Sequence, residues 1–250
     1  MKLSAAARSD VGLRRTTNED AYVLAPAMGL YLVADGMGGH VAGQLASRLA
    51  AQITVEALQK VADRHASLTE KLRFCVAWAN HVVYATAQEK PEVAGMGTTL
   101  VAVLAGSGRL ALAHVGDSRA YLVRGGRIRQ LTDDHSLVAE LVRRRELSPD
   151  AAQDHPHRHV LTRALGVRRR VDADLAELTP AAMDVIVLCS DGLTTHVQDP
   201  EIAALVAAEA DLDEACARLV GLANARGGDD NVTVALVRCE DHEASAPVPG

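Results

Sequence analysis

Apolar residues along the chain fall into short runs and longer periodic segments. The short runs are rich in Val, Leu and Ala and are bounded by Gly, Asp or Asn, which is typical of strands. They cover 30–34, 98–104, 110–115, 120–123, 127–131, 185–189 and 231–237. The longer segments carry apolar residues at helical spacing. They predict helices over about 41–64, 68–88, 136–145, 200–209 and 212–225.

The middle strands follow one another through tight turns at 107–108, 116–118 and 125–126. Such short connections predict antiparallel pairing of the strands that they join, because a parallel crossover needs a dozen residues or more. Two long helices precede this meander and two follow it. We therefore expect an α+β fold in which helices cover antiparallel sheet, and not a doubly wound parallel fold.

Composition and charge narrow the range of partners. The 250 residues include 26 Lys and Arg against 32 Asp and Glu, a formal charge of −6. This balance argues against nucleic acid as a partner, since duplex binding needs a dense basic surface. Binding of single strands needs several aromatic residues for stacking, and only 2% of this chain is aromatic. No apolar run approaches the roughly 20 residues that span a bilayer, so no membrane segment is expected.

The spacing of the cysteines and the sequence of the N-terminus indicate the cellular compartment. The four cysteines are widely spaced and form no CxxC pair, and the N-terminus has no hydrophobic stretch long enough for a secretory signal. These features favour a reduced cytoplasm. A monomer is the default expectation.

Two segments differ from the rest of the chain. Residues 143–170, called the flap below, hold eight Arg and three acidic residues, a charge opposite in sign to that of the whole chain. The flap is expected on the surface, either attracting acidic phosphopeptides or forming only a soluble mobile loop. Residues 240–250 are predicted to be a disordered tail, which leaves residues 1–239 as a single domain.

Several carboxylates lie at the ends of apolar runs, beside or close to glycine. They are Asp35, Asp117, Asp191 and Asp229 with Asp230. One Asp-Gly pair is a common turn, but four strand ends of this kind predict a shared acidic pocket. Clustered carboxylates repel each other unless a cation neutralises them. Oxygen ligands without Cys or His nearby favour Mg²⁺ or Mn²⁺ over zinc. The alternative is four ordinary turns.

The N-terminal stretch SDVGLRRTTNEDA has a different balance of charge. Arg15 lies three residues before Asn18, which is followed by Glu19 and Asp20. Arginine makes planar, bidentate contacts with phosphate, and carboxylates nearby can hold metal-bound waters. An exposed, salt-bridged turn is the alternative.

From Ser9 to Val237 the chain resembles the type 2C, metal-dependent Ser/Thr protein phosphatases, in particular their compact bacterial members. The resemblance rests on eight motifs in the order typical of that family. They are SDVGLRRTTNED (9–20), VADGMGGH (33–40), GMGTTLV (95–101), HVGDSRAYL (114–122), LTDDHS (131–136), LTRALG (161–166), LCSDGLT (188–194) and GGDDNVTV (227–234).

The resemblance implies an αββα sandwich of two antiparallel β-sheets flanked by α-helices, with a binuclear Mn²⁺ or Mg²⁺ centre at one edge. It implies that Asp35 bridges the two ions and that the Gly36 carbonyl is a further ligand. The remaining implied roles are Asp191 and Asp230 on the first ion, Asp117 with Asp191 on a weaker third ion, Glu19 and Asp20 through metal-bound waters, and Arg15 on the substrate phosphate.

The implied reaction is hydrolysis of phosphoserine and phosphothreonine in proteins by a metal-bridging hydroxide, without a phosphoenzyme. The leaving-group acid stays open. Some relatives carry a His two residues after the bridging Asp, where this chain has Met37. His40 is the nearest alternative, and a metal-bound water is another. The expected partners are phosphorylated proteins and a cognate bacterial Ser/Thr kinase.

Two other functions compete with this one. A pseudophosphatase that binds phosphoproteins without turnover would lose metal ligands, whereas every implied ligand is present here. A phosphatase for small phosphate esters would use the same centre, so the motifs do not separate it from a protein phosphatase.

Overall fold

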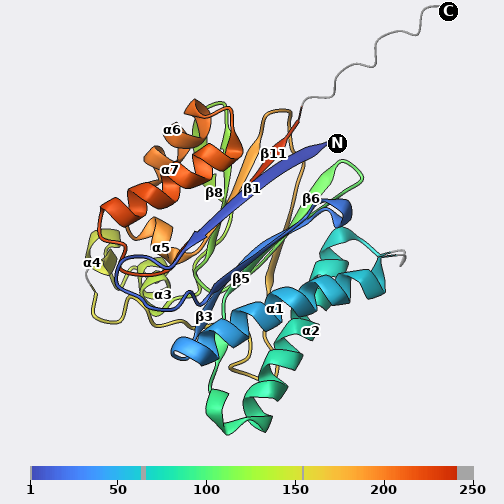
Figure 1. The fold of residues 1–250 in the computed structure, drawn as a ribbon, viewed down its shortest axis with the longest axis vertical. Helices are drawn as coiled ribbons and strands as arrows, with labels where there is room; N and C mark the ends of the chain where they lie inside the picture. Colours follow the sequence, from blue (N-terminus) through green and yellow to red (C-terminus); the bar gives the residue numbers. More distant parts are fainter. Residues whose placement is uncertain (1, 63–65, 154, 241–250) are drawn as a thin grey trace, which may run out of the picture.

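The chain forms two antiparallel sheets packed face to face, with a layer of helices outside each sheet (Figure 1). The computed structural model describes residues 2–62, 66–153 and 155–240, and within them all side chains except those of His40 and Gln153. The two helix-covered antiparallel sheets confirm the expected α+β fold and αββα sandwich. Apart from Glu240, the predicted tail lies outside the described residues.

The first sheet has the strand order β1-β11-β10-β7-β8. Its strands are β1 (Leu3–Asp10), β11 (Val232–Cys239), β10 (Val185–Cys189), β7 (Arg119–Arg124) and β8 (Arg127–Gln130). The second sheet has the order β2-β3-β5-β6-β9, and the short β4 pairs with β3. Its strands are β2 (Asp20–Ala25), β3 (Leu30–Met37), β4 (Gly97–Thr98), β5 (Leu100–Gly106), β6 (Arg109–Val115) and β9 (Asp174–Leu178).

Helices α1 (His40–Val61) and α2 (Leu68–Glu89) pack on the second sheet, and α6 (Asp199–Ala208) and α7 (Leu212–Ala225) pack on the first. The short helices α3 (Leu137–Arg143), α4 (Pro149–Gln153) and α5 (Asp191–Thr194) gather at one end of the sandwich (Figure 1). Two 3₁₀ turns, Pro26–Met28 and Pro91–Val93, complete the described elements. Within the described residues, no helix combines the length and apolar character needed to span a bilayer.

The core has three layers because the central strands are buried on both faces. In β3, Leu30 and Leu32 pack against α1 and α2, while Tyr31 and Val33 face the opposite sheet. Successive side chains of a strand point to opposite faces, so a strand between a helix layer and a second sheet needs apolar residues at every position. This requirement explains why the strands occur in the sequence as uninterrupted apolar runs.

The turn at 116–118 differs from the expectation. The turns at 107–108 and 125–126 close antiparallel hairpins as predicted. The prediction that the turn at 116–118 also pairs its flanking strands was wrong, because β6 and β7 belong to different sheets. Gly116 instead exchanges hydrogen bonds with His135, donating its N–H to Nδ1 and accepting the His135 N–H. Asp117 therefore lies where the chain crosses between the sheets.

A buried histidine on β6 predicts a pH-dependent stability. His114 is 1% exposed, and neither ring nitrogen has a hydrogen-bond partner within the described residues. Burial, with the neighbouring ring of His135, lowers the pKa of His114 to about 4. The unfolded chain takes up this proton near pH 6.5 and the folded chain does not, so the contribution of His114 to stability falls as the pH drops from about 6.5 to about 4.

Urea unfolding in EDTA at pH 7 and pH 5 measures this effect. Between these two values the wild type should lose about 2 kcal/mol more unfolding free energy than His114→Leu, which removes the titrating group. Equal losses in the two proteins would contradict the assignment to His114.

Candidate metal centre

Two carboxylates oppose each other on neighbouring strands at the edge of the second sheet. Asp20, the first residue of β2, is the direct antiparallel partner of Asp35 in β3. Side chains of direct partners have Cβ atoms about 5 Å apart, and like charges in such positions destabilise a sheet. Asp20 is 6% exposed, so water screens the repulsion poorly. A cation bound between these two carboxylates would remove it.

Three further carboxylates reach the same place from the first sheet and from the crossing turn. Asp191 begins α5 directly after β10, Asp230 precedes β11, and Asp117 lies between β6 and β7. Burial raises the pKa of Asp35 well above its ordinary value, and the charges of Asp20, Asp191, Asp117 and Asp230 add to this. The structure therefore forms the acidic pocket that the strand ends predicted.

The pKa values of three other carboxylates in the cluster are also raised. Burial raises the pKa of Asp20 to about 7, against hydrogen bonds that lower it. Burial also raises the pKa values of Asp117 and Asp191, and the carboxylates nearby contribute to both shifts. Several acidic groups brought together at such a cost are typical of a functional site.

The donor atoms fit a hard divalent cation. Asp20 Oδ1 and Asp191 Oδ1 are buried, and neither has a hydrogen-bond partner within the described residues. A buried polar atom without a partner is unfavourable, and a bound cation would satisfy both oxygens. The donors that converge here are carboxylate oxygens, which Mg²⁺ and Mn²⁺ prefer.

Neighbouring hydroxyl and backbone groups hold these carboxylates in place. Ser190 donates to Asp20 Oδ2 at 2.8 Å, and its own oxygen accepts the Thr233 N–H. The Asp35 N–H donates to Thr99 Oγ1 at 2.9 Å, and the Asp35 carbonyl accepts bonds from the Thr99 N–H and the Thr98 hydroxyl, both at 2.8 Å. The metal-facing end of β3 therefore has a fixed backbone.

Glu19 and Gly36 meet at the first turn of α1. The Gly36 N–H donates to the Glu19 carbonyl at 3.1 Å. A Cβ at Gly43 would overlap Glu19 Oε2 and would lie 2.9 Å from the Gly36 carbonyl oxygen. The helix can pack this closely against two of the implied ligands only because residue 43 has no side chain.

The substitution Gly43→Ala tests this close approach. The added methyl group must displace the Glu19 carboxylate or the helix, so we expect about ten-fold weaker Mn²⁺ binding and a similar loss of activity at limiting metal. Gly221→Ala in α7 is the matched control, because a Cβ there meets no atom within 4 Å. Unchanged Mn²⁺ affinity in Gly43→Ala would show that this contact does not control the site.

Arg15 lies beside the carboxylate cluster. Its Nη2 atom is 2.8 Å from Asp230 Oδ2, and its side chain is 44% exposed. An exposed guanidinium next to a cation site is suited to bind the oxygens of a phosphate group. Of the two interpretations of the N-terminal stretch, the structure shows a salt bridge, and this salt bridge lies at the predicted site.

Asn231 fastens the loop that carries Arg15. Its Oδ1 atom accepts the Glu19 N–H at 2.7 Å, and its Nδ2 atom donates to the carbonyls of Val11 and Thr17 at 2.9 and 3.0 Å. Asn231 is 4% exposed. Its role could not be inferred from the sequence, although it adjoins Asp230, because its partners are more than 200 positions away.

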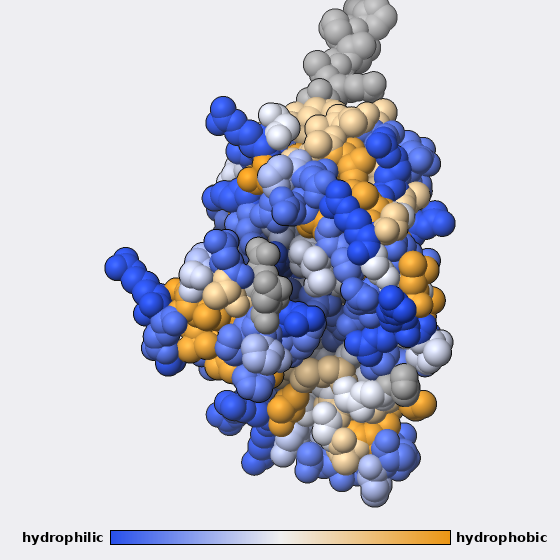
Figure 2. All heavy atoms as spheres, turned by 90° about the vertical axis from the view of Figure 1, so that its left-hand side faces the viewer, coloured by the Kyte–Doolittle hydropathy of each residue, from blue (hydrophilic) through white to orange (hydrophobic). Residues whose placement is uncertain are grey.

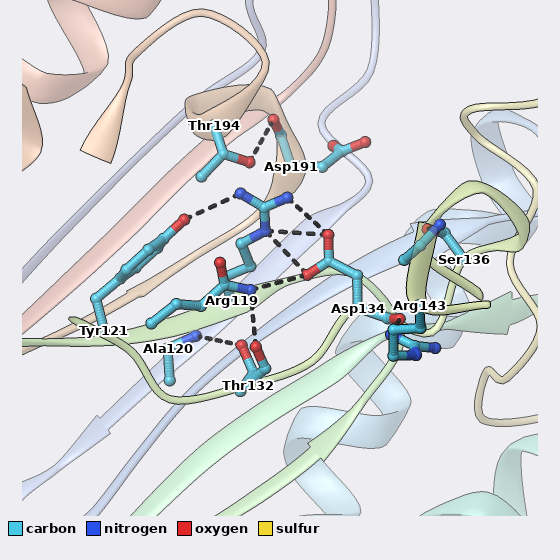
Figure 3. A network of polar contacts seen from close by, with 11 residues as sticks. Arg119, Ala120, Tyr121, Thr132, Asp134, Ser136, Arg143, Asp191 and Thr194 are labelled. Carbon is cyan, nitrogen blue, oxygen red and sulfur yellow. Dashed lines mark hydrogen bonds and ion pairs between the residues drawn. The ribbon is translucent and has the colours of Figure 1, made fainter. Parts of the chain in front are cut away.

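A partly buried ion pair next to the cluster was also missed. Arg119 binds Asp134 through Nε and Nη2, the shortest distance being 2.7 Å, and it donates to the Tyr121 hydroxyl at 3.1 Å. Figure 3 shows this network with Asp191 close by. The positive charge of Arg119 opposes the rise in the pKa values of Asp117 and Asp191. Both Arg119 and Asp134 lie within motifs of the resemblance.

The predicted general acid His40 is not tested. It is the first residue of α1, but its side chain lies outside the described residues. Met37, which stands at the alternative position, packs towards Gly97 and Val167. The identity of the acid stays a prediction.

A second group of possible ligands consists of His114, His135 and Asp174. His135 Nδ1 accepts the Gly116 N–H at 3.1 Å, and Nε2 lies 3.1 Å from Asp174 Oδ2. A neutral imidazole that accepts at Nδ1 carries its proton on Nε2, so His135 donates to Asp174 and has no lone pair left for a metal. His135 and Asp174 therefore form a hydrogen-bonded pair, and His114 contacts it through the ring of His135, with the ring centroids 4.6 Å apart. This arrangement fits a metal site poorly.

The flap lies at the same end of the sandwich as the carboxylates. The charge of His159 in the flap acts on Asp191 and opposes the rise in the pKa of that carboxyl. The face that carries the short helices α3, α4 and α5 is hollowed near its centre and is largely hydrophilic (Figure 2). A polar substrate can approach the carboxylate cluster from this side.

Comparison with known proteins gives a consistent result. Residues 14–233 match the family described as Protein phosphatase 2C. Serine/threonine phosphatase stp of Listeria monocytogenes serovar 1/2a is 38% identical over 238 residues, which cover 92% of this chain and 93% of that protein. Serine/threonine protein phosphatase PstP of Mycobacterium tuberculosis is 40% identical over 246 residues, covering 98% of this chain and 46% of that protein.

Solved structures agree with the sequence relatives. The crystal structure of Mycobacterium tuberculosis PstP/Ppp superposes with a TM-score of 0.86 at 39% identity, covering 96% of this chain and 99% of that one. The catalytic domain of PstP in complex with two manganese ions superposes with a TM-score of 0.84 at 38% identity, with the same coverage. The chain therefore belongs to the protein phosphatase 2C family, as its motifs indicated, and is a metal-dependent Ser/Thr phosphoprotein phosphatase.

Proposed function

We propose that the carboxylate cluster holds two Mn²⁺ or Mg²⁺ ions and a weaker third, and that these ions serve the hydrolysis of phosphoserine and phosphothreonine. The observation that carries the proposal is the pair Asp20 and Asp35, opposed in register, together with the buried, unpartnered oxygens of Asp20 and Asp191. The PstP structure with two manganese ions supports the same number here.

Each carboxylate has a separate proposed role. Asp35 would bind both ions, and the Gly36 carbonyl would be a further ligand. Asp191 and Asp230 would bind the first ion, and Asp117 would bind the third together with Asp191. Glu19 and Asp20 would act through water molecules on the ions. Support for the third site comes from the Asp191 charge, which is the largest charge effect on the pKa of Asp117.

When bound, such ions lower the pKa of water and offset the negative charge on the phosphoryl oxygens. Arg15 orients the phosphate group from the rim of the cluster and adds a positive charge to its oxygens. Asn231 fixes the loop that carries Arg15, and Ser190 fixes Asp20. The pseudophosphatase alternative is not favoured, because every proposed ligand is present.

The proposed biological setting follows from the reaction. The substrates are phosphorylated proteins, and a cognate Ser/Thr kinase supplies them. The enzyme acts as a monomer in the cytoplasm.

Phosphate release from a phosphothreonine peptide, with Mn²⁺, Mg²⁺ or EDTA, tests the proposal. The wild type should be active only with metal, and equilibrium binding should saturate with two tight ions and a third, weaker one. Arg15→Ala should raise KM for the phosphopeptide by about ten-fold, since it removes one charge-assisted contact with phosphate. Its two tight metal sites should remain. An unchanged KM would remove Arg15 from the phosphate site.

A further inference from the structure

A groove of about 200 Å³ opens beside the metal-facing end of β3. Its lining includes Met37, Thr162, Arg163, Arg168, Arg170 and Asp172. We call it the arginine groove. Met37 follows Asp35 and Gly36 directly in β3, so the groove begins within two residues of the carboxylate cluster.

The loop that presents the arginines is anchored to α2. Asn80, which is 1% exposed, accepts the Gly166 N–H at 2.9 Å. Its Nδ2 atom donates to the carbonyls of Arg168 and Arg169 at 3.1 and 3.3 Å. The buried Asn80 amide thus holds the loop backbone at Gly166 and at Arg168 and Arg169, so the backbone that carries the guanidinium groups is fixed.

The arginines of this groove differ in whether an acidic side chain already pairs with them. Arg163 donates to Asp174 Oδ1 at 2.6 Å and to the Asp172 carbonyl. Arg168 and Arg170 in the lining are exposed, as is Arg169 between them, which does not line the groove. None of the three makes a side-chain hydrogen bond or ion pair within the described residues. Three consecutive positive charges are therefore uncompensated in a chain whose net charge is −6.

Thr162, one of the residues that line the groove, has a polar atom without a partner. The hydroxyl oxygen of Thr162 is buried and has no hydrogen-bond partner within the described residues. A hydroxyl can donate to a carboxylate or phosphate oxygen. In this conformation the oxygen has no exposed surface, so it would reach a bound anion only after rotation of the Thr162 side chain.

We propose that the arginine groove binds a negatively charged side chain of the phosphoprotein, an Asp, a Glu or a second phosphorylated residue, close in sequence to the residue being dephosphorylated. The proposal rests on the proposed function, because binding of the phosphate at the carboxylate cluster sets the position of the phosphorylated residue, and its neighbours in the peptide extend from there. An extended peptide advances about 3.3 Å per residue, so the chain passing over Met37 enters the groove within a few residues.

Phosphopeptide kinetics test the groove with two variants that remove the same charge. Arg168→Gln/Arg170→Gln removes it from the groove, and Arg144→Gln/Arg145→Gln removes it elsewhere in the flap. The substrates are one phosphothreonine peptide with neutral flanks and a set that places a single Glu or phosphoserine at each flanking position. On peptides that carry the acidic residue at the position recognised by the groove, the groove variant should have an about five-fold lower kcat/KM, caused by a higher KM.

The same variant should change less than about two-fold on the neutral peptide. The control variant should change the kinetics of both peptides equally. If the groove variant loses equally on neutral and acidic peptides, or no more than the control on the acidic ones, the groove does not recognise an anionic side chain.

A metal-free binding assay separates this proposal from the catalytic one. Fluorescence anisotropy in EDTA, with the unphosphorylated acidic peptide as the probe, should show weak binding to the wild type that Arg168→Gln/Arg170→Gln reduces. Binding of this kind without any phosphate release would keep the groove and overturn the proposed catalytic roles. Phosphate release without discrimination between peptides would do the reverse.

Discussion

Replacing Asp35 by asparagine is expected to abolish activity and, in the absence of metal, to stabilise the fold. The carboxylate proposed to bridge two ions is lost, so activity should fall by at least about a thousand-fold, equivalent to several kcal/mol of transition-state stabilisation. Without metal, the neutral amide of Asp35→Asn removes the repulsion that Asp20, Asp191, Asp117 and Asp230 exert on the carboxylate. We expect about 1–3 kcal/mol of added stability, a rise in Tm of several degrees.

The pH dependence provides an independent check of this substitution. A carboxyl whose pKa is raised in the folded state binds its proton more tightly there than in the unfolded chain. The contribution of the carboxylate cluster to the stability of the metal-free wild type should therefore decline as the pH rises from about 4 to about 7, the value for Asp20, and Asp35→Asn should flatten this decline. Saturating Mn²⁺ should reverse the order of stability, because only the wild type retains the complete site.

Asp133→Asn is the matched control, since Asp133 is exposed and lies outside the cluster. It should change neither activity nor stability. Melting curves in EDTA and in Mn²⁺, together with phosphate release, complete the test. A metal-free Asp35→Asn protein less stable than the wild type would mean that Asp35 makes a favourable interaction in the apo fold.

The sequence pattern predicted the buried strands and missed those with weak local signals. The strand β1 has the sequence LSAAARSD, with no β-branched residue, and β9 reads DLAEL, whose residues favour helices. Both occupy sheet edges and owe their conformation to pairing, β1 with β11 and β9 with β6. Such pairing is a tertiary effect that a local pattern does not contain.

Some residues of the candidate site were likewise predictable from the local sequence pattern, and others depend on tertiary contacts. Asp35, Asp117, Asp191 and Asp230 were predictable because each follows or precedes an apolar run that ends at one edge. Gly43 could not be identified in this way, since its role depends on the approach of α1 to Glu19. The resemblance supplied roles that spacing alone does not give, and the carboxylates assigned to the ions do converge.

Breaking the ion pair between Arg119 and Asp134 is expected to give the largest loss of stability. The exposed fractions of these side chains are 28% and 14%, so each charge depends on the other for most of its polar contacts. Arg119→Leu leaves the Asp134 carboxylate partly buried, with Gln130 as its remaining side-chain partner within the described residues. We expect about 2–4 kcal/mol of lost unfolding free energy, since removing one partner of a buried pair exposes the desolvation cost of the other.

A double-mutant cycle decides whether the pair acts as a unit. Asp134→Leu should also destabilise the protein, and the double variant should be about 1–3 kcal/mol more stable than the sum of the two losses predicts. Urea unfolding in EDTA gives the four free energies without a contribution from metal. Additive losses would mean that Arg119 and Asp134 stabilise the fold independently.

The consequence of this pair for the metal site follows from its position. Arg119 lies two residues after Asp117, and its guanidinium is close to Asp191 in Figure 3. The pair thus anchors the turn where the chain crosses between the sheets, and it places a fixed positive charge next to two ligands of the proposed third ion. In Arg119→Leu the affinity for this weaker ion should change, while the two tighter ions proposed for Asp35, Asp191 and Asp230 should still bind. Equilibrium Mn²⁺ binding to the variant distinguishes the two classes of site, and loss of all three ions would show that the ion pair supports the whole centre.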